Sequence, residues 1–226
     1  MTKPATGVIL DTETTGKEED AEVLQLAYVE IDDSLRETAN ACNTYHLPTK
    51  GIEWGALATH HLYPEKLARL GAIAERAVPP IADYYIGHNS DFDWKMLGSP
   101  PEVRRICTLA LAKYHWPDTQ GHSLGACMYR ISADFEATDV RLRNAHSALA
   151  DVSMCLELLY YFVHHYNCKD LHSLWLLSEH ARIPTVMPFG KHKGERIADI
   201  PRHYKLWALK QPDFDEYVLL AFRASL

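Results

Sequence analysis

The sequence of 226 residues has no apolar run near the roughly 18 residues that cross a bilayer. Its N-terminal segment lacks the apolar stretch of a signal peptide. Its five cysteines are odd in number and include no C-x-x-C pair, which argues against a disulfide framework and a structural zinc site. We therefore expect a soluble cytoplasmic protein that does not associate with membranes.

Neither repeats nor low-complexity tracts occur, and a composition of 47% hydrophobic and 23% charged residues is that of an ordinary globular protein. The net charge of −7 is unevenly distributed. Residues 1–180 sum to −10 and residues 181–226 sum to +3. We expect a main domain at 1–181 and a small basic module at 182–226, with the boundary near Pro184 and Pro188. The acidic main domain is not suited to broad binding of duplex DNA by charge alone.

The pattern of apolar residues predicts an α/β fold. Strands are expected at residues 7–10, 22–31, 40–47, 83–87 and 105–107, with the first two paired as a hairpin. Helices are expected at 54–61, 64–77, after 88, from 108 to about 115, at 123–129, from near Asn144 to 165, at 202–210 and at 214–223. This order predicts a mixed five-stranded sheet flanked by helices, followed by the small basic C-terminal segment.

The first candidate motif is D-x-E at Asp11 and Glu13, directly after the strand predicted at 7–10. D-x-E is expected about once by chance at this composition, so its context matters more than the match. Side chains alternate along a strand, and both acids therefore project from one face, about 6–7 Å apart along the backbone. They can reach a shared cation. Two solvated acids at the end of a strand are the alternative.

The hexapeptide HNSDFD at 88–93 is much more specific. It follows the strand predicted at 83–87, and ligand crevices of α/β sheets form at the carboxyl ends of strands. We expect Phe92 to be a buried anchor that turns Asp93 toward the crevice, with Asp91 solvated or in a supporting position. A simple helix cap is the alternative, but a cap needs one Asn or Asp rather than this cluster.

The third signal is H-x4-D at His146 and Asp151. The spacing alone is weak, because two other pairs share it. Asp151, however, lies within the strongest helical periodicity of the chain, among apolar neighbours, while His146 precedes it on the entry turn. A half-buried carboxylate needs a partner, and a metal ion is a suitable one. A histidine at a helix start and a solvated aspartate remain the alternative.

Taken together, these motifs supply four carboxylates and one histidine. Oxygen ligands of this kind suit Mg²⁺ or Mn²⁺ rather than zinc. Two such ions can clamp a phosphodiester, with one preparing a water and the other stabilising the leaving oxygen. A histidine with an ordinary pKa of about 6.5 can take the proton of that water at neutral pH.

In this order, DTETTG at 11–16, HNSDFD at 88–93 and HSALAD at 146–151 resemble the motifs of the DEDDh exonucleases. The resemblance covers roughly residues 5–165. It implies a ribonuclease H-like fold and stepwise 3′→5′ removal of nucleoside 5′-monophosphates from the 3′ ends of nucleic acids, most simply DNA. It also implies two Mg²⁺ ions, for which Mn²⁺ can substitute.

The same resemblance implies a role for individual residues. Metal binding and catalysis would fall to Asp11, Glu13, Asp93 and Asp151, with His146 as the general base. Contacts to the substrate would fall to Thr12, Thr14, His60 and Asn89. Three further segments are similar to exodeoxyribonucleases X, namely ALATHHL at 56–62, ICT at 106–108 and FGKHKG at 189–194. One departure is His61, which stands where the family commonly has glycine, and it leaves the shape of the 3′-end pocket open.

The basic C-terminal segment supplies candidate nucleic-acid contacts at Lys191, Lys193 and Arg196, with aromatic residues interleaved. Charge and stacking together are typical of binding to single strands. The alternative is a small helical cap whose aromatics form a core and whose lysines are solvated. The sequence does not determine the role of this segment. It also does not determine whether the protein forms a homodimer.

Three other functions remain open at this point. The catalytic set does not distinguish the sugars, so an exoribonuclease of the same family is the nearest alternative. A non-catalytic module that binds nucleic acid or a polymerase would predict the loss of at least one carboxylate, and none is missing. A structural protein that acts through its basic tail would lose function on deletion of 183–226 but not on Asp11→Ala.

Overall fold

The computed structural model describes residues 6–117, 121–143 and 145–226. Five strands form one sheet in the order β3-β2-β1-β4-β5. They are β1 (Thr6–Thr14), β2 (Val23–Asp32), β3 (Glu37–Tyr45), β4 (Tyr84–Gly87) and β5 (Arg104–Cys107). The pairs β1–β2 and β2–β3 are antiparallel, whereas β1–β4 and β4–β5 are parallel. The predicted mixed sheet and its first hairpin are confirmed.

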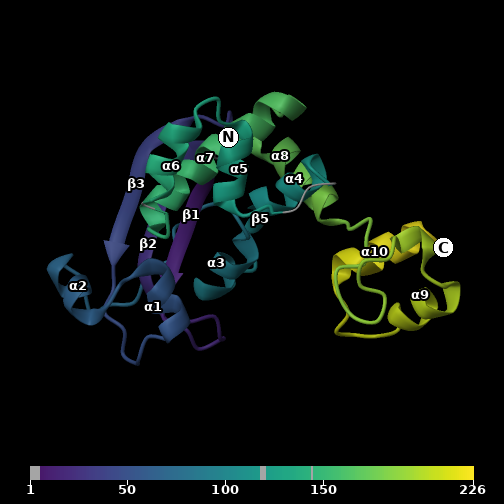
Figure 1. Ribbon diagram of the computed structural model, residues 1–226, viewed down its shortest axis with the longest axis horizontal. Coiled ribbons are helices and arrows are strands. Elements are labelled where there is room, and N and C mark those ends of the chain that lie inside the picture. The colour runs from purple at the N-terminus through teal and green to yellow at the C-terminus, as the bar shows by residue number, and fades with distance from the viewer. Residues whose placement is uncertain (1–5, 118–120, 144) are drawn as a thin grey trace.

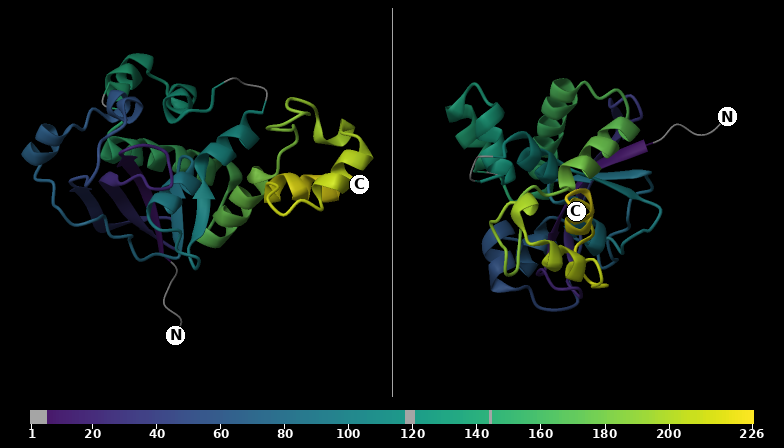
Figure 2. Two further views of the ribbon diagram at one scale, coloured as in Figure 1. Left: turned by 90° about the horizontal axis from the view of Figure 1, so that it is seen from below. Right: turned by 90° about the vertical axis from the view of Figure 1, so that its right-hand side faces the viewer.

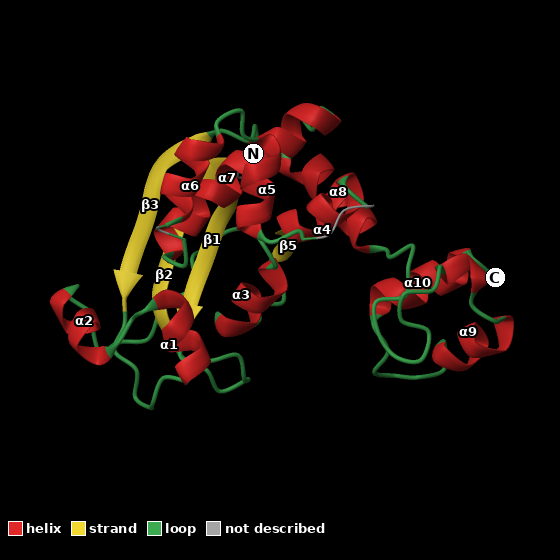
Figure 3. Ribbon diagram, in the orientation of Figure 1, coloured by secondary structure: helices red, strands yellow, loops and turns green. Residues whose placement is uncertain are grey.

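The helices surround this sheet and then continue beyond it (Figures 1 and 3). Those up to the end of the sheet-bearing part are α1 (Trp54–His60), α2 (Pro64–Arg69), α3 (Ser90–Met96), α4 (Thr108–His115), α5 (Leu124–Ile131), α6 (Phe135–Leu142), α7 (Ala148–Tyr166) and α8 (Leu171–Arg182). The C-terminal part contains the short 3-10 helix η1 (Ile197–Asp199), α9 (Arg202–Ala208) and α10 (Glu216–Ala224). Among the described residues, no helix is long and apolar enough to span a membrane.

Strand β1 separates two hydrophobic layers, because its side chains alternate between the faces of the sheet. Ile9 belongs to the larger core, which contains the buried side of α7, while Val8 and Leu10 belong to the core on the opposite face. Asp11 and Glu13 have the same parity as Ile9. The alternation therefore directs both acids toward the face that α7 covers.

Several elements differ from the sequence prediction. Helix α2 ends at Arg69 rather than at residue 77, because Gly71 adopts a left-handed φ of 76° and the backbone N–H of Ile73 then donates to the Tyr45 carbonyl. Strand β1 extends to Thr14, so both acids of the first motif lie within it. Helices α6 and α8 were not predicted. Helix α7 begins at Ala148, whereas its predicted start at Asn144 lies outside the described residues.

The C-terminal unit, by which we mean residues 182–226, has a hydrophobic cluster of its own. It is built from seven buried residues, Met187, Ile197, Ile200, Ala208, Val218, Ala221 and Phe222. Figure 1 and the left view of Figure 2 place α9 and α10 at one end of the molecule, beyond α8. We propose that this unit is a module distinct from the domain at 1–181, of which residues 1–5, 118–120 and 144 lie outside the described part.

Candidate active site

Three carboxylates from distant parts of the chain meet at one face of the sheet. Asp11 and Glu13 stand on β1, and Asp151 lies in the first turn of α7. One carboxylate oxygen from each of these three residues lies within 4.8 Å of the other two. The placement of Asp151 on the same side of the sheet as the D-x-E pair, on which the sequence interpretation depends, is thereby established.

Gln25 positions the helix that carries Asp151. It lies opposite Glu13 on β2, and its buried side-chain carbonyl accepts a hydrogen bond of 3.2 Å from the backbone N–H of Ala148, the first residue of α7. The side-chain amide donates to Asn43 on β3 at 2.8 Å. Sequence reasoning missed this residue, although a lone glutamine within the apolar segment EVLQLAYVEI is a signal that could have found it.

Asp93 joins the cluster from α3, at the carboxyl end of β4. Its Oδ1 accepts hydrogen bonds from the Thr12 backbone N–H at 2.9 Å and from the Thr12 hydroxyl at 2.7 Å. Gly87 packs closely beside this contact: a Cβ at that position would lie 3.2 Å from the Leu10 carbonyl oxygen, which is a tight contact, and 3.5 Å from Asp93 Oδ2, which is an ordinary one. The second carboxylate oxygen of Asp93 is not used in the contact with Thr12.

Burial shifts the pKa values of the four acids upward, and the neighbouring charges add to the shift at two of them. Burial raises the pKa of Asp11 well above its usual range, and the charges of Asp93, Asp151 and Glu13 add to the shift. Burial, followed by the charges of Asp151 and Asp93, raises the pKa of Glu13 to about 8. The pKa of Asp93 rises to about 6 through burial, although its bonds from Thr12 oppose the rise. Burial also raises the pKa of Asp151.

The donor set fits a hard divalent cation. Among the described residues, no lysine or arginine forms an ion pair with any of the four carboxylates. Partly buried acids that repel one another are costly unless a cation compensates them. Oxygen ligands of this kind are those that Mg²⁺ and Mn²⁺ prefer.

His146 lies beside the cluster, on the turn that leads into α7. Its backbone has a left-handed φ of 64°, and its backbone N–H donates to Asp151 Oδ2 at 3.2 Å. The residue is exposed. This agrees with the predicted position of His146 on the entry turn, while its role as a general base remains a prediction.

The predicted substrate contacts have different surroundings. The Thr12 hydroxyl is bound to Asp93, and the Thr14 hydroxyl donates to the Gly16 carbonyl at 2.6 Å. His60 is buried, with Nε2 3.1 Å from the Thr14 carbonyl and Nδ1 accepting from the Leu62 N–H at 2.9 Å. Its ring joins α1 to the end of β1. Contacts of these three residues with substrate remain predictions.

Asn89 has a position more open to a ligand. It is the N-cap residue of α3, with a left-handed φ of 83°, and its side chain makes no capping bond. It lines a surface cavity of about 560 Å³ together with Lys17, which follows the first motif, and Lys95 of α3. The acids Glu19 and Asp91 line it as well, so groups of both charges and an amide lie beside the helix that carries Asp93.

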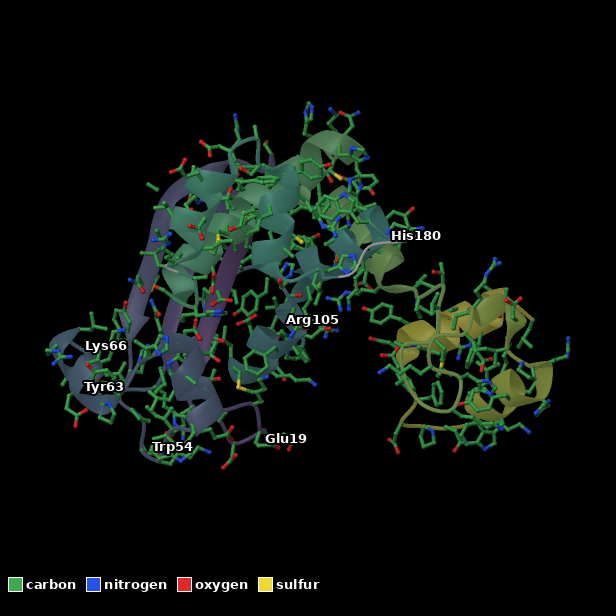
Figure 4. The ribbon with its side chains drawn as sticks, viewed as in Figure 1. Glu19, Trp54, Tyr63, Lys66, Arg105 and His180 are labelled. Carbon is green, nitrogen blue, oxygen red and sulfur yellow. The ribbon has the colours of Figure 1, made fainter. Side chains whose placement is uncertain are left out.

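Asp91 has an ion-pair role that the sequence did not reveal. It pairs with Arg105 of β5 at 2.7 Å and with Arg182, the last residue of α8, at 2.6 Å. Burial opposes ionisation of Asp91, but the two arginines outweigh it and lower its pKa. The Arg182 guanidinium also lies over the Tyr217 ring at 5.4 Å. Figure 4 shows Arg105 on the side of the sheet toward the C-terminal unit.

The three predicted basic contacts Lys191, Lys193 and Arg196 are exposed. They belong to the C-terminal unit, which lies away from the sheet in Figure 1. The structure thus brings the four carboxylates and His146 together and places these cations elsewhere.

Comparison with known proteins matches two parts of the chain to families. Residues 8–159 match a family model described as "Exonuclease". Residues 178–217 match a second model, described as "Putative quorum-sensing-regulated virulence factor". A curated relative, the uncharacterized protein YpeB of Escherichia coli K12, is 50% identical over 30 residues. That match spans 13% of this chain and 42% of the length of the relative.

Solved structures also resemble this chain. Exonuclease X in complex with 5′-overhanging duplex DNA matches with a TM-score of 0.56 at 20% identity, over 76% of this chain and 99% of the other. Exonuclease I of E. coli in complex with a dA16 oligonucleotide matches with a TM-score of 0.54 at 15% identity, over 81% of this chain and 46% of the other. At these identities the likeness establishes a shared ribonuclease H-like fold.

Proposed function

This chain belongs to the exonuclease family, and on that premise we propose that it is a metal-dependent 3′→5′ exonuclease that releases nucleoside 5′-monophosphates from DNA. One observation carries the proposal: carboxylates of Asp11, Glu13 and Asp151, from a strand and a distant helix, lie within 4.8 Å of one another. An arrangement in which buried acids repel one another is costly for folding and suited to holding cations.

Asp11, Glu13, Asp93 and Asp151 would hold two Mg²⁺ ions, and Mn²⁺ can substitute. When bound, such ions polarise the phosphodiester, activate the attacking water and stabilise the leaving oxygen. The residues of the chain supply position and charge. Thr12 fixes one oxygen of Asp93, and Gln25 fixes the start of the helix that carries Asp151.

His146 would accept the proton of the attacking water. As the water oxygen bonds to phosphorus, the bond from phosphorus to the 3′ oxygen of the preceding nucleotide breaks. The leaving 3′ oxygen takes a proton from solvent and His146 returns its proton to solvent, so that the products are a nucleoside 5′-monophosphate and a strand with a new 3′-hydroxyl. The exposed position of His146 beside Asp151 suits this task, because its ring can reach solvent while its backbone is held by the carboxylate.

Asn89, Lys17 and Lys95 would contact the substrate strand in the cavity beside α3. The two structural neighbours described above contain DNA, as duplex and as oligonucleotide, and this favours DNA over RNA as the substrate of this chain. An exoribonuclease remains the second candidate, because the carboxylate set does not read the 2′-hydroxyl. A non-catalytic module is less favoured, since the described chain retains every carboxylate of the motifs.

The test is to incubate the full-length protein with Mg²⁺ and 5′-labelled single-stranded DNA, duplex DNA and RNA of the same sequence. We expect a ladder that shortens from the 3′ end of DNA, with 5′-monophosphates as products. Asp151→Asn and Asp93→Asn should remove this activity, and His146→Ala should lower its rate at pH 7 by about 100-fold or more.

The control is Asp139→Asn, which changes an exposed aspartate on α6 that is paired with Arg143 rather than with the cluster. This variant should retain the activity of the wild type. Shortening from the 5′ end, a preference for RNA, or full activity in Asp151→Asn would each contradict the proposal in its present form.

A further inference from the structure

A row of aromatic rings crosses the C-terminal unit. Successive ring centroids lie 5.4 Å apart between Phe189 and Phe214, 6.3 Å between Phe214 and Trp207, 5.3 Å between Trp207 and Tyr204, and 4.4 Å between Tyr204 and His192. The rings of the row differ in their exposure to solvent. His192 is only 8% exposed, whereas Phe189 is 39% exposed and Trp207 is 51% exposed. His192 therefore packs against Tyr204 as a buried ring, whereas Phe189 and Trp207 expose part of their ring surface to solvent.

The loop from 189 to 194 places two lysines beside this row. Gly190 and Gly194 have left-handed φ values of 70° and 88°, which let the chain turn tightly. The Gly194 N–H donates to the Met187 carbonyl at 2.9 Å and closes the loop. Lys191 and Lys193 flank the buried His192 and are themselves exposed. Since His192 packs on Tyr204, both lysines are held next to the aromatic row rather than on a loose segment.

The charges of this surface are available to a partner. Within the described part of the chain, Lys191, Lys193 and Lys210 form no ion pair. The nearby acid Glu195 contacts the His192 ring, whose Nδ1 lies 3.0 Å from Oε2, rather than either lysine. Lys205 differs, because it is buried and its ammonium donates to the carbonyls of Ala198 and Ser225. The structure thus separates the lysines that support the fold from those that face solvent.

We propose that this surface is a second nucleic-acid site, which binds single-stranded nucleic acid by stacking unpaired bases on Trp207 and Phe189 while Lys191 and Lys193 contact the phosphates. Open aromatic faces next to unpaired cations are the features by which proteins hold single strands without reading sequence. A duplex would offer its phosphates but not its base faces. The inference rests on the proposed function, since the strand held here would be the strand degraded at the carboxylate cluster.

The test measures binding separately from cleavage. Fluorescence anisotropy of a 5′-labelled dT20 oligonucleotide is followed with the full-length protein in EDTA, over a range of salt concentrations. The variants are Trp207→Ala, Trp207→Phe and K191A/K193A. The matched control is K113A/K169A, which removes two exposed lysines outside the C-terminal unit. Circular dichroism establishes that each variant is folded.

We expect Trp207→Ala to weaken binding at least about fivefold, and Trp207→Phe to retain most of the affinity, because the ring can still stack. K191A/K193A should make the slope of log affinity against log salt shallower by about 1.4, or about 0.7 for each phosphate that is no longer neutralised by a lysine. The control variant should bind like the wild type. Duplex DNA without overhangs should bind more weakly than dT20.

Equal affinity of Trp207→Ala, K191A/K193A and the control would overturn the inference, as would duplex binding as tight as that of dT20. These outcomes leave the proposed function standing if the wild type still shortens DNA in Mg²⁺. Conversely, loss of dT20 binding in Trp207→Ala together with no cleavage by the wild type would support this site and contradict the nuclease proposal.

Discussion

At the residue scale, the candidate site consists of acids whose pKa values are raised by burial and, at Asp11 and Glu13, also by the neighbouring carboxylates. Glu13 is the clearest case, because burial and its acidic neighbours bring its pKa to about 8 from an ordinary value of 4.5. At Asp93, hydrogen bonds from the hydroxyl and the backbone N–H of Thr12 oppose the rise in pKa that burial causes. The carboxylate cluster therefore carries an electrostatic cost that a bound cation would remove, and this cost depends on pH.

This cost predicts how stability responds to pH and metal. The folded protein holds the proton of Glu13 more tightly than the unfolded chain does, so the stability of the metal-free protein falls as pH rises from about 4.5 to about 8. Mn²⁺ should therefore raise the melting temperature more at pH 8 than at pH 6, by several degrees. Thermal unfolding with EDTA or Mn²⁺ measures this, with Glu13→Gln as the comparison, in which the fall with pH should be smaller. An equal metal effect at both pH values would contradict the assignment.

His61 is a second residue whose backbone matters more than its side chain. It ends α1 in the left-handed region, with φ 56°, and its N–H donates to the Leu57 carbonyl. Glycine adopts this conformation without the steric cost that a Cβ brings. The resemblance to the DEDDh exonucleases predicts glycine at this position, and the left-handed backbone gives a physical reason for that expectation.

We expect His61→Gly to stabilise the protein by about 0.5–1 kcal/mol, because relief of the left-handed strain exceeds the added entropy of glycine. Urea denaturation measures the change, with His61→Ala as the control that retains the Cβ. A loss of stability in His61→Gly relative to His61→Ala would show that the imidazole makes a contact that outweighs the strain.

At the scale of elements, the sequence predicted the sheet better than its surroundings. The five strands were recognisable because apolar segments alternate with turns, and the D-x-E parity followed from the strand geometry. Helix α8 was missed even though Asp170 and Ser173 form a capping box at its start. The bond from Gln25 to α7 and the two arginine partners of Asp91 are contacts across long stretches of chain, which periodicity does not encode.

Gln25 provides a prediction at this scale. Gln25→Leu keeps the volume but leaves the Ala148 N–H without its partner, which costs about 1–3 kcal/mol when buried. We expect a melting temperature lower by about 2–10 °C and a drop in turnover of about tenfold, with weaker metal affinity because the first turn of α7 carries Asp151. Asn43→Ala is the control, since it removes one of the two acceptors of the Gln25 side-chain amide, the other being the Tyr45 hydroxyl, and spares the bond to α7. Unchanged metal affinity in Gln25→Leu would argue against this positioning role.

Arg182 provides another prediction, which concerns the junction between α8 and the C-terminal unit. Its guanidinium is bound to Asp91 and lies over Tyr217, whose hydroxyl donates to Glu179 at 3.1 Å. We expect Arg182→Ala to loosen this junction and to increase cleavage by subtilisin at residues 183–188 several-fold. Arg182→Lys should have an intermediate effect, because it retains the charge but not the planar stacking. Cleavage rates that do not change in Arg182→Ala would show that other contacts hold the unit.

At the scale of the whole molecule, acidic and basic residues are concentrated in different parts of the chain. The part that contains the sheet is acidic and gathers carboxylates at one face, while the C-terminal unit is basic, has its own apolar cluster and lies at one end (Figures 1 and 2). The change in charge along the sequence predicts a boundary near residue 182, and the division into two domains remains our proposal. Only the coordinates distinguish the buried Lys205 from the solvent-exposed Lys191 and Lys193.

The most direct test of the central claim is to locate bound cations. Crystals of the wild-type protein soaked with Mn²⁺ and a nucleoside 5′-monophosphate would be measured at a wavelength where manganese scatters anomalously. We expect two anomalous peaks enclosed by the carboxylates of Asp11, Glu13, Asp93 and Asp151, and their loss in Asp151→Asn. An empty cluster at saturating Mn²⁺, in crystals where Mn²⁺ binds elsewhere, would contradict the claim that these acids form a catalytic metal site.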